Sequence, residues 1–424
     1  MFVLSPGRYW RTFAIDTREF VLFVNCRQSA VGRGPCLRIS ETKGISFAGL
    51  QRLSSSAGSH KIVKADAILV SIPFESGGVP PWSFGGAPKL QFDTLLVRLE
   101  TEQGVVGWGE AFSRCEDKSL KAMIETRVLP LVIGRSALEI GKIKYDLEFQ
   151  LQNFGRVGPI VYGVSAVDIA LWDILGKISG LPLTALLGGA FASEVEVYAS
   201  LMRYGNCADV VRATRQAIER GYRYIKLHEV TEDEIRAAVE AAGAQAAVML
   251  DTNCPWPVAE ALKYDRLLEP LNLYWLEEPV WPPENYAGLA RIRSTGRHHI
   301  AAGENAGSLH DFVAMIAAGA IDIAQPDVAK AGGISELLQI AALCQAEAIE
   351  FVPHCAIFGP GQVATIHLNA AQRSVPMLER LYCDFEAEIY GGATLPVNGK
   401  VAVPTGPGLG LDPDPGVINR YRVA

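Results

Sequence analysis

A repeating pattern of short apolar runs separated by helical segments dominates the chain from about residue 195 onward. Apolar strands that alternate with helices are typical of a parallel sheet, because the helices cover and bury both of its faces. Eight units in series favour a (β/α) barrel. An open, doubly wound sheet is the weaker alternative, and no GxGxxG motif follows the first run. The predicted strands are 195–200, 222–227, 247–251, 273–277, 300–304, 321–325, 349–353 and 377–381.

A polar residue stands near the C-terminal end of each predicted strand, and successive ones are 23 to 27 residues apart. Each step is one strand and one helix, so these side chains should follow one another around the barrel. The C-terminal ends of barrel strands form the face that carries catalytic residues. The eight residues are Ser200, Lys226, Asp251, Glu277, Glu304, Asp327, His354 and Glu379.

Three consecutive members of this series are carboxylates, Asp251, Glu277 and Glu304. Three negative charges on neighbouring strands repel one another unless a cation lies among them. A ligand set made only of oxygen selects a hard ion such as Mg²⁺ over zinc. The spacing therefore predicts a Mg²⁺ site. The alternative is that such acids merely cap the helices that follow.

Several segments together resemble the enolase superfamily, and specifically its mandelate racemase-like branch. The resemblance covers roughly residues 62–415 and implies a modified (β/α)₇β barrel with an α+β capping domain, one Mg²⁺ per subunit, and removal of the proton next to a carboxylate. It rests on Gly107-Trp108-Gly109-Glu110, Leu250-Asp251-Thr252-Asn253, Trp275-Leu276-Glu277-Glu278-Pro279, Gly303-Glu304-Asn305, Gln325-Pro326-Asp327, Lys330-Ala331-Gly332-Gly333, Pro353-His354, Met377-Leu378-Glu379-Arg380-Leu381 and Thr405-Gly406-Pro407-Gly408-Leu409-Gly410.

The predicted organisation has three parts. Residues 1–60 carry a net charge of +5 without a clear period and are expected to form a poorly ordered extension. Residues 61–160 read as the α+β capping domain, to which the tail 385–424 returns. Residues 161–384 read as the barrel. Within the cap, 65–74, 94–100 and 105–110 are predicted strands, and 119–132 and 138–154 are predicted helices.

A loop at 76–86 holds six glycines and prolines and two aromatic residues, Trp82 and Phe84. Such a long loop is either an exposed excursion or a lid that closes over a site. In the lid interpretation Trp82 and Phe84 contact the substrate.

The resemblance also assigns acid–base residues. Asp327 and His354 match the branch's Asp–His pair, in which the carboxylate fixes the tautomer of the imidazole and raises its basicity. One departure is plain, because the family's usual Lys-x-Lys is here Lys226-Leu227-His228. Strand alternation keeps 226 and 228 on one face. His228 is predicted to act as an acid or base, with a polar substrate contact as the alternative, and Lys226 to keep it neutral or to bind a carboxylate oxygen.

Two further residues complete the predicted site. Glu379 is expected to be protonated and to donate a hydrogen bond to a substrate carboxylate oxygen; a salt bridge, for instance to Arg380, is the alternative. Asn253, two residues beyond Asp251, is expected to contact a substrate hydroxyl.

The preferred reaction is dehydration of a sugar acid through an enediolate. Racemisation or epimerisation, and cycloisomerisation of a lactone, use the same site. A non-catalytic sugar-acid-binding barrel and a metal-dependent aldolase-type barrel are the rivals.

Composition argues against several other classes of protein. The net charge of −7 does not suit a nucleic-acid-binding surface, and no apolar run reaches the length of about 20 residues that spans a membrane. Eight cysteines without a CxxC pair indicate neither a disulfide framework nor a zinc motif. A cytoplasmic enzyme acting on a small carboxylate is expected, and the resemblance implies a homo-oligomer.

Overall fold

The computed structural model of the chain describes residues 60–76, 91–113 and 118–423. The predicted N-terminal extension, apart from His60, lies outside the described residues. So do the predicted lid residues Trp82 and Phe84. Both interpretations stay predictions.

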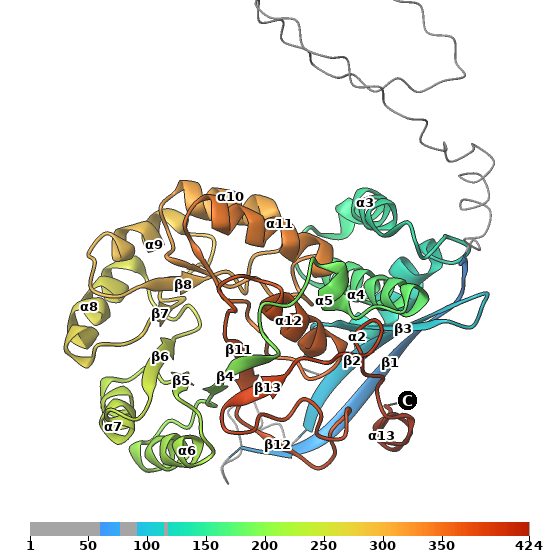
Figure 1. Ribbon diagram of the computed structural model, residues 1–424. Coiled ribbons are helices and arrows are strands. Elements are labelled where there is room, and N and C mark those ends of the chain that lie inside the picture. The colour runs from blue at the N-terminus through green and yellow to red at the C-terminus, as the bar shows by residue number, and fades with distance from the viewer. Residues whose placement is uncertain (1–59, 77–90, 114–117, 424) are drawn as a thin grey trace, which may run out of the picture. The chain divides into compact units, whose positions relative to one another are not determined.

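The larger sheet is parallel and curls into a barrel with its helices outside (Figure 1). Its strand order is β10-β9-β8-β7-β6-β5-β4-β11, and this arrangement with an antiparallel cap confirms the predicted fold class. Beyond the end of β10, the Cys355 amide donates a hydrogen bond to Glu379 Oε2 of β11 at 3.0 Å, across the two ends of the sheet. The strands are β4 (Glu194–Ser200), β5 (Tyr224–Leu227), β6 (Ala247–Asp251), β7 (Leu276–Glu277), β8 (Ile300–Ala302), β9 (Ile323–Ala324), β10 (Glu350–Phe351) and β11 (Leu378–Leu381).

Two of the barrel helices, α6 and α9, begin at asparagine caps. The side chain of Asn206 accepts a hydrogen bond from the Asp209 amide, and Asn285 does the same for Gly288, so each satisfies a free N–H of the first turn. The helices are α6 (Cys207–Glu219), α7 (Glu232–Ala242), α8 (Val258–Leu268), α9 (Tyr286–Arg293), α10 (Leu309–Ala317), α11 (Gly333–Ala346) and α12 (Pro360–Ala370), with a 3₁₀ turn at Glu269–Leu271.

The cap is built on an antiparallel sheet of order β12-β1-β2-β3. Alternate side chains of its long strand serve two cores: Ala67 and Leu69 pack toward the cap helices, and Ile68 and Val70 pack toward the barrel. The elements are β1 (Ile62–Glu75), β2 (Gln91–Thr101), β3 (Val106–Ala111) and β12 (Asp384–Phe385), with α2 (Lys118–Met123), a π-turn at Ile124–Val128, 3₁₀ turns at Leu129–Leu131 and Gln152–Phe154, α3 (Ile140–Leu151) and α4 (Pro159–Ser179).

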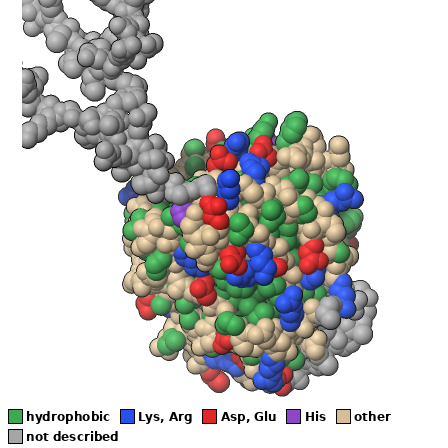
Figure 2. Space-filling view, turned by 90° about the vertical axis from the view of Figure 1, so that its right-hand side faces the viewer, with side chains coloured by type: hydrophobic (Ala, Val, Ile, Leu, Met, Phe, Trp, Pro, Cys, Tyr) green, Lys and Arg blue, Asp and Glu red, His purple; other side chains and the backbone are tan. Residues whose placement is uncertain are grey.

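The C-terminal segment returns to both parts of the molecule. Strand β13 (Lys400–Ala402) pairs antiparallel with β4, and helix α13 (Pro415–Tyr421) lies against β1. A short helix α5 (Leu183–Leu186) connects α4 to the first barrel strand. On the cap side shown in Figure 2, acidic, basic and apolar side chains are interspersed.

Helix α4 is packed between the cap sheet and the barrel. Adding a Cβ to Gly107 or Gly109 of β3 would place it 2.2 or 1.8 Å from a backbone oxygen of α4, so only glycine permits this approach. Asp173 of α4 accepts hydrogen bonds from the Trp108 amide of the cap and the Leu409 amide of the tail. Among the described residues α4 alone is long and apolar enough to span a membrane, yet 78% of its apolar window is buried in the protein.

The barrel interior beneath the catalytic face is filled by apolar and aromatic side chains from six positions. The rings of Tyr198 and Trp275 meet edge to face, with centroids 5.8 Å apart. This apolar layer lies below the polar residues of the site. Its members are Tyr198, Met249, Trp275, Ala301, Ile323 and Val352.

Candidate active site

Asp251, Glu277 and Glu304 converge as the strand spacing predicts. One carboxylate oxygen from each lies within 4.8 Å of the other two, and Asp251 and Glu277 are buried. Asp251 ends β6, Glu277 ends β7, and Glu304 lies two residues beyond β8. Three oxygen donors at this separation fit a hard divalent ion such as Mg²⁺ and would repel one another without one.

Hydrogen bonds fix the orientation of two members of this triad. The Asn253 amide N and side-chain Nδ2 both donate to Asp251 Oδ1, at 2.9 and 3.1 Å. Glu277 Oε2 accepts from Trp275 Nε1 and Gln325 Nε2, both at 2.9 Å. Oriented carboxylates hold a metal ion better than free ones, because outer partners set the direction of the ligand oxygens.

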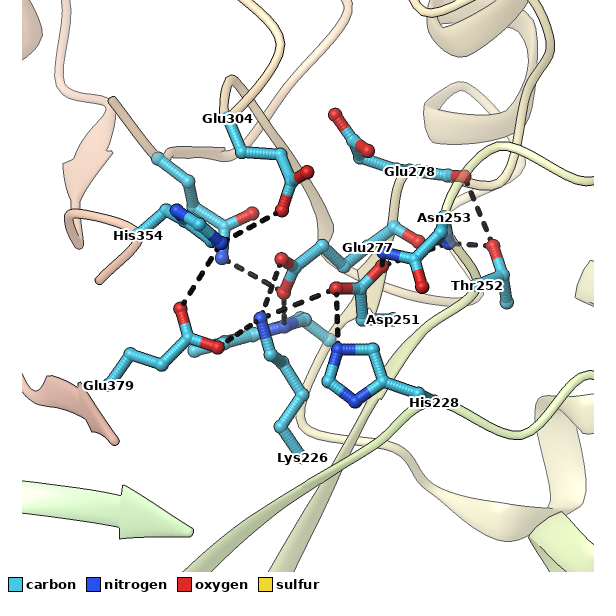
Figure 3. A network of polar contacts seen from close by, with 12 residues as sticks. Lys226, His228, Asp251, Thr252, Asn253, Glu277, Glu278, Glu304, His354 and Glu379 are labelled. Carbon is cyan, nitrogen blue, oxygen red and sulfur yellow. Dashed lines mark hydrogen bonds and ion pairs between the residues drawn. The ribbon is translucent and has the colours of Figure 1, made fainter. Parts of the chain in front are cut away.

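Lys226 lies below the triad and is fully buried. Its Nζ contacts Glu379 Oε1 at 2.8 Å, Glu277 Oε1 at 2.9 Å and Asp251 Oδ2 at 3.4 Å (Figure 3). Burial alone would lower its pKa, but these carboxylates outweigh burial and raise the pKa well above the ordinary value. Three carboxylates around one ammonium favour its charged form, so Lys226 balances the negative charge of the acids.

Glu379 lies between two basic side chains, Lys226 and His354. Burial would raise its pKa, but the charges of Lys226 and His354 outweigh burial and hold the pKa below the usual range. It also accepts the Cys355 amide N–H. A carboxyl group between two cations favours its charged form. The expected hydrogen bond from a protonated Glu379 to a substrate carboxylate oxygen stays a prediction.

His354 and Asp327 meet as the predicted pair. His354 Nδ1 lies 2.6 Å from Asp327 Oδ2, and His354 Nε2 lies 3.0 Å from Glu304 Oε2. Burial would lower the imidazole pKa, but the charges of Glu304 and Glu379 and the bond to Asp327 raise it to about 10. The ring is consequently held by a carboxylate on one nitrogen and presents its other nitrogen to the acid cluster.

His228 stands on the other side of the cluster. Its Nε2 lies 3.2 Å from Asp251 Oδ2, and its Nδ1 contacts the Leu201 carbonyl oxygen. In Figure 3 the rings of His228 and His354 flank Asp251 and Glu277 from opposite sides. Two titratable rings are thus placed on either side of the position that the acids surround.

A cavity of about 410 Å³ opens above these groups, large enough for a small sugar acid. His228, Asn253, Glu304 and His354 line it, together with aromatic residues of the cap and of the β7 loop. The full lining is Phe112, Tyr162, Met202, Arg203, His228, Asn253, Cys254, Glu278, Trp281, Pro283, Glu304, Asn305, Lys330, His354 and Leu381.

Arg203 and Lys330 are two cations of this cavity that the sequence interpretation did not assign. Arg203, three residues beyond β4, donates from Nη2 to Asn253 Oδ1 at 3.3 Å and from Nε to the His228 carbonyl oxygen. Lys330, three residues beyond Asp327, lies 3.8 Å from Glu304 Oε1. Both lie on loops that follow barrel strands. A basic residue on such a loop is the sequence signal that could have identified them.

Glu278, next to the triad, is a buried acid with partners of its own. Asn305 Nδ2 donates to both of its oxygens, at 3.0 and 2.9 Å, and Cys254 Sγ lies 3.4 Å from Oε2. Burial and the neighbouring charge of Glu304 raise its pKa to about 8. The backbone of Asn253, Cys254 and Glu278 adopts left-handed φ angles of 45° to 55°, an uncommon conformation for non-glycine residues that concentrates at functional sites.

Two known families match successive parts of the chain. Residues 85–188 match the mandelate racemase / muconate lactonizing enzyme N-terminal domain, and residues 209–417 match the enolase C-terminal domain-like family. All three triad carboxylates and both histidines fall in the second match.

Individual relatives cover most of the chain. A D-galactarolactone cycloisomerase of Agrobacterium fabrum is 30% identical over 357 residues, covering 79% of this chain and 93% of that protein. A D-galactonate dehydratase of Verminephrobacter eiseniae is 31% identical over 347 residues, covering 75% and 88%. The crystal structure of a Streptomyces coelicolor racemase with bound magnesium superposes with a TM-score of 0.75 and 28% identity, covering 85% of this chain and all of that one.

Proposed function

This chain belongs to the mandelate racemase/muconate lactonizing enzyme family of the enolase superfamily, and we propose that it dehydrates a sugar acid by removing its α-proton with the aid of one Mg²⁺ per subunit. The observation that carries the proposal is the position of His228 and His354 on opposite sides of the acid triad. Both rings line one cavity. A substrate held there would present one face to each ring.

Asp251, Glu277 and Glu304 would hold the ion, whose charge stabilises the enediolate that forms when an α-proton leaves. His228 would take the proton from one side. His354, held by Asp327, would deliver a proton to the departing hydroxyl on the other side. Lys226 would offset the repulsion between the carboxylates and so hold them close together. Asn253 would contact a substrate hydroxyl while its amide orients Asp251.

Relatives named as dehydratases and as cycloisomerases leave two further outcomes of the same first step. Return of a proton to the opposite face would give racemisation or epimerisation. Departure of a lactone ring oxygen from the carbon next to the α-carbon, in place of a hydroxyl, would give cycloisomerisation. Each outcome starts with removal of the α-proton, which exchange with D₂O can report, whereas a barrel that only binds sugar acids would show no exchange. An aldolase-type barrel would break a carbon–carbon bond.

Three broader features belong to the same proposal. Residues 61–160 with the tail 385–424 would cap the site that residues 161–384 supply. The enzyme would act in the cytoplasm and as a homo-oligomer. Light scattering of the purified protein measures the subunit number, and fractionation of the producing cell locates it.

The deciding experiment incubates the enzyme with a panel of acid sugars and Mg²⁺ in H₂O and in D₂O. Formation of a 2-keto acid measures loss of water, and NMR measures deuterium at the α-carbon. Dehydration by the wild type that stops in EDTA and returns with Mg²⁺ supports the proposal. Exchange without loss of water would favour the racemase alternative. Absence of both with every substrate would defeat it.

A further inference from the structure

Lys330 is a buried lysine whose ammonium lacks a hydrogen-bond acceptor among the described residues. Its side chain is 7% exposed, and its ion pair with Glu304 Oε1, at 3.8 Å, is too long for a hydrogen bond. The ammonium also lies 4.6 Å from the centroid of the Phe112 ring. A buried charge without hydrogen bonds is costly, so such a group normally finds a partner.

Other buried lysines of the chain show what a satisfied ammonium looks like. Lys226 contacts three carboxylates, two of them within 2.9 Å. Lys144, which is 9% exposed, pairs with Glu336 Oε2 at 2.7 Å and with Glu148. Lys330 differs from both because it lines the active-site cavity and its donors face space that a ligand can fill.

The position of Lys330 relative to His354 indicates which ligand atom it can reach. The two side chains contact different oxygens of the same carboxylate: Lys330 faces Glu304 Oε1, and His354 Nε2 faces Glu304 Oε2. They therefore lie side by side at one wall of the cavity. A substrate oxygen that receives a proton from His354 lies within reach of the Lys330 ammonium.

We propose that Lys330 contacts the substrate and donates a hydrogen bond to the oxygen that leaves from the carbon next to the α-carbon. The inference rests on the proposed dehydration. In that step a base takes the α-proton, the C–H electron pair forms a double bond to the neighbouring carbon, and the C–O pair departs with the oxygen. His354 gives that oxygen a proton, so that water is released, while Lys330 keeps its protons and offsets the negative charge as it develops.

The test separates proton removal from oxygen departure. Lys330→Met removes the charge and the donors with little change of volume, and Lys330→Arg keeps both. With Mg²⁺ saturating and a sugar acid that the wild type dehydrates, Lys330→Met should lower dehydration about 100-fold, the size of loss seen when one transition-state donor is removed. Exchange of the α-proton in D₂O should fall much less. Lys330→Arg should recover part of the dehydration.

Lys144→Met is the matched control, since it removes a buried lysine that is fully paired and outside the site. It should lower the melting temperature and leave the ratio of dehydration to exchange as in the wild type. Mg²⁺ binding without substrate, measured by calorimetry, shows whether Lys330 acts only through Glu304.

Three results would overturn the inference: normal dehydration by Lys330→Met, an equal loss of dehydration and exchange, or a loss explained by weaker Mg²⁺ binding. Failure of the proposed function itself looks different, because the wild type would then show neither reaction with any acid sugar.

Discussion

Asp327 and His354 are joined twice, through a parallel backbone bridge between neighbouring strand ends and through a side-chain contact of 2.6 Å between Oδ2 and Nδ1. The double link fixes both the position and the orientation of the ring. A carboxylate that accepts from Nδ1 leaves Nε2 directed to the cavity and stabilises the imidazolium. His354 is thereby set up to exchange protons with a ligand.

Asp327→Asn should preserve the shape of this pair and remove its charge. We expect kcat to fall by at least about 100-fold with a smaller change in KM. The lost carboxylate charge stabilises the protonated imidazole during the reaction and contributes little to substrate binding in the ground state. The Asp265–His298 pair, also buried and 2.9 Å apart, is the control. Asp265→Asn should reduce the melting temperature without changing kcat. Equal kcat in Asp327→Asn and the wild type would remove His354 from the mechanism.

Replacement of any triad carboxylate by its amide, for example Glu277→Gln, should abolish Mg²⁺-dependent activity while the fold persists. Each acid supplies one of only three oxygen donors to the ion. Mg²⁺ binding by calorimetry is the direct measurement. Glu278→Gln is the neighbouring control, and it should still bind the ion. Full activity of the wild type in excess EDTA would contradict the metal assignment.

Arg203→Met should lower kcat/KM by roughly 10-fold, since Arg203 holds both the Asn253 side chain and the His228 backbone. The residue acts through these two neighbours, so the expected signature is a shift in the pH profile of kcat/KM together with the loss. Arg223, exposed and paired with Glu196 at 2.7 Å, provides the control. If Arg203→Met and Arg223→Met behave alike, Arg203 does not position the site.

Gly109→Ala should prevent the cap hairpin from seating on α4. The new Cβ would lie 1.8 Å from the Ala166 carbonyl oxygen, which requires the backbone to move. We expect a loss of several kcal/mol of unfolding free energy, or insoluble protein. Gly141→Ala, in helix α3 with no atom within 4 Å of the new Cβ, should be neutral or stabilising by up to about 1 kcal/mol. Denaturant unfolding measures both, and similar midpoints would refute the steric argument.

His367 makes stability depend on pH in a defined direction. It is buried in α12, its Nε2–H donates to the Leu409 carbonyl oxygen at 3.0 Å, and burial lowers its pKa to about 4. The unfolded chain, with an imidazole pKa near 6.5, binds the proton more readily. His367 therefore costs no stability above about pH 6.5 and lowers it progressively as the pH falls toward 4.

His367→Gln keeps a donor for Leu409 and cannot titrate in this range. Between pH 7 and pH 5 the wild type should lose about 2 kcal/mol more than the variant, from 1.36 kcal/mol per pH unit over the interval below 6.5. Urea unfolding at the two pH values measures the difference. Parallel pH dependences would mean that His367 is not the group responsible.

The periodicity of the sequence predicted the parts of the site that the barrel itself positions. Asp251, Glu277, Glu304, Asp327 and His354 occupy strand ends, so topology alone brings them together. The predicted strands at 273–277, 321–325 and 349–353 were longer than the two-residue ladders observed for β7, β9 and β10. An apolar run in the sequence indicates buried residues. The buried stretch is longer than the part of it that forms hydrogen-bonded strand pairs.

What the sequence could not predict depends on contacts across the site. The surroundings of Glu379 depend on Lys226 Nζ at 2.8 Å and His354 Nε2 at 3.8 Å, distances that no spacing rule provides. Arg203 and Lys330 lie on loops, where the regular strand-to-strand spacing no longer applies. Their roles follow from contacts in the folded site: Arg203 reaches Asn253 and the His228 backbone, and Lys330 lines the cavity.

Helix α4 contributes side chains to the cores of both parts of the molecule. Ile169 packs with the barrel, while Val164 and Ile174 pack with the cap. Because one helix belongs to both cores, the cap and the barrel cannot separate without exposing part of α4. They should therefore unfold in a single thermal transition. For protein engineering, a cap borrowed from a relative to change specificity would have to bring its own version of α4, or be redesigned to fit the face that this one presents.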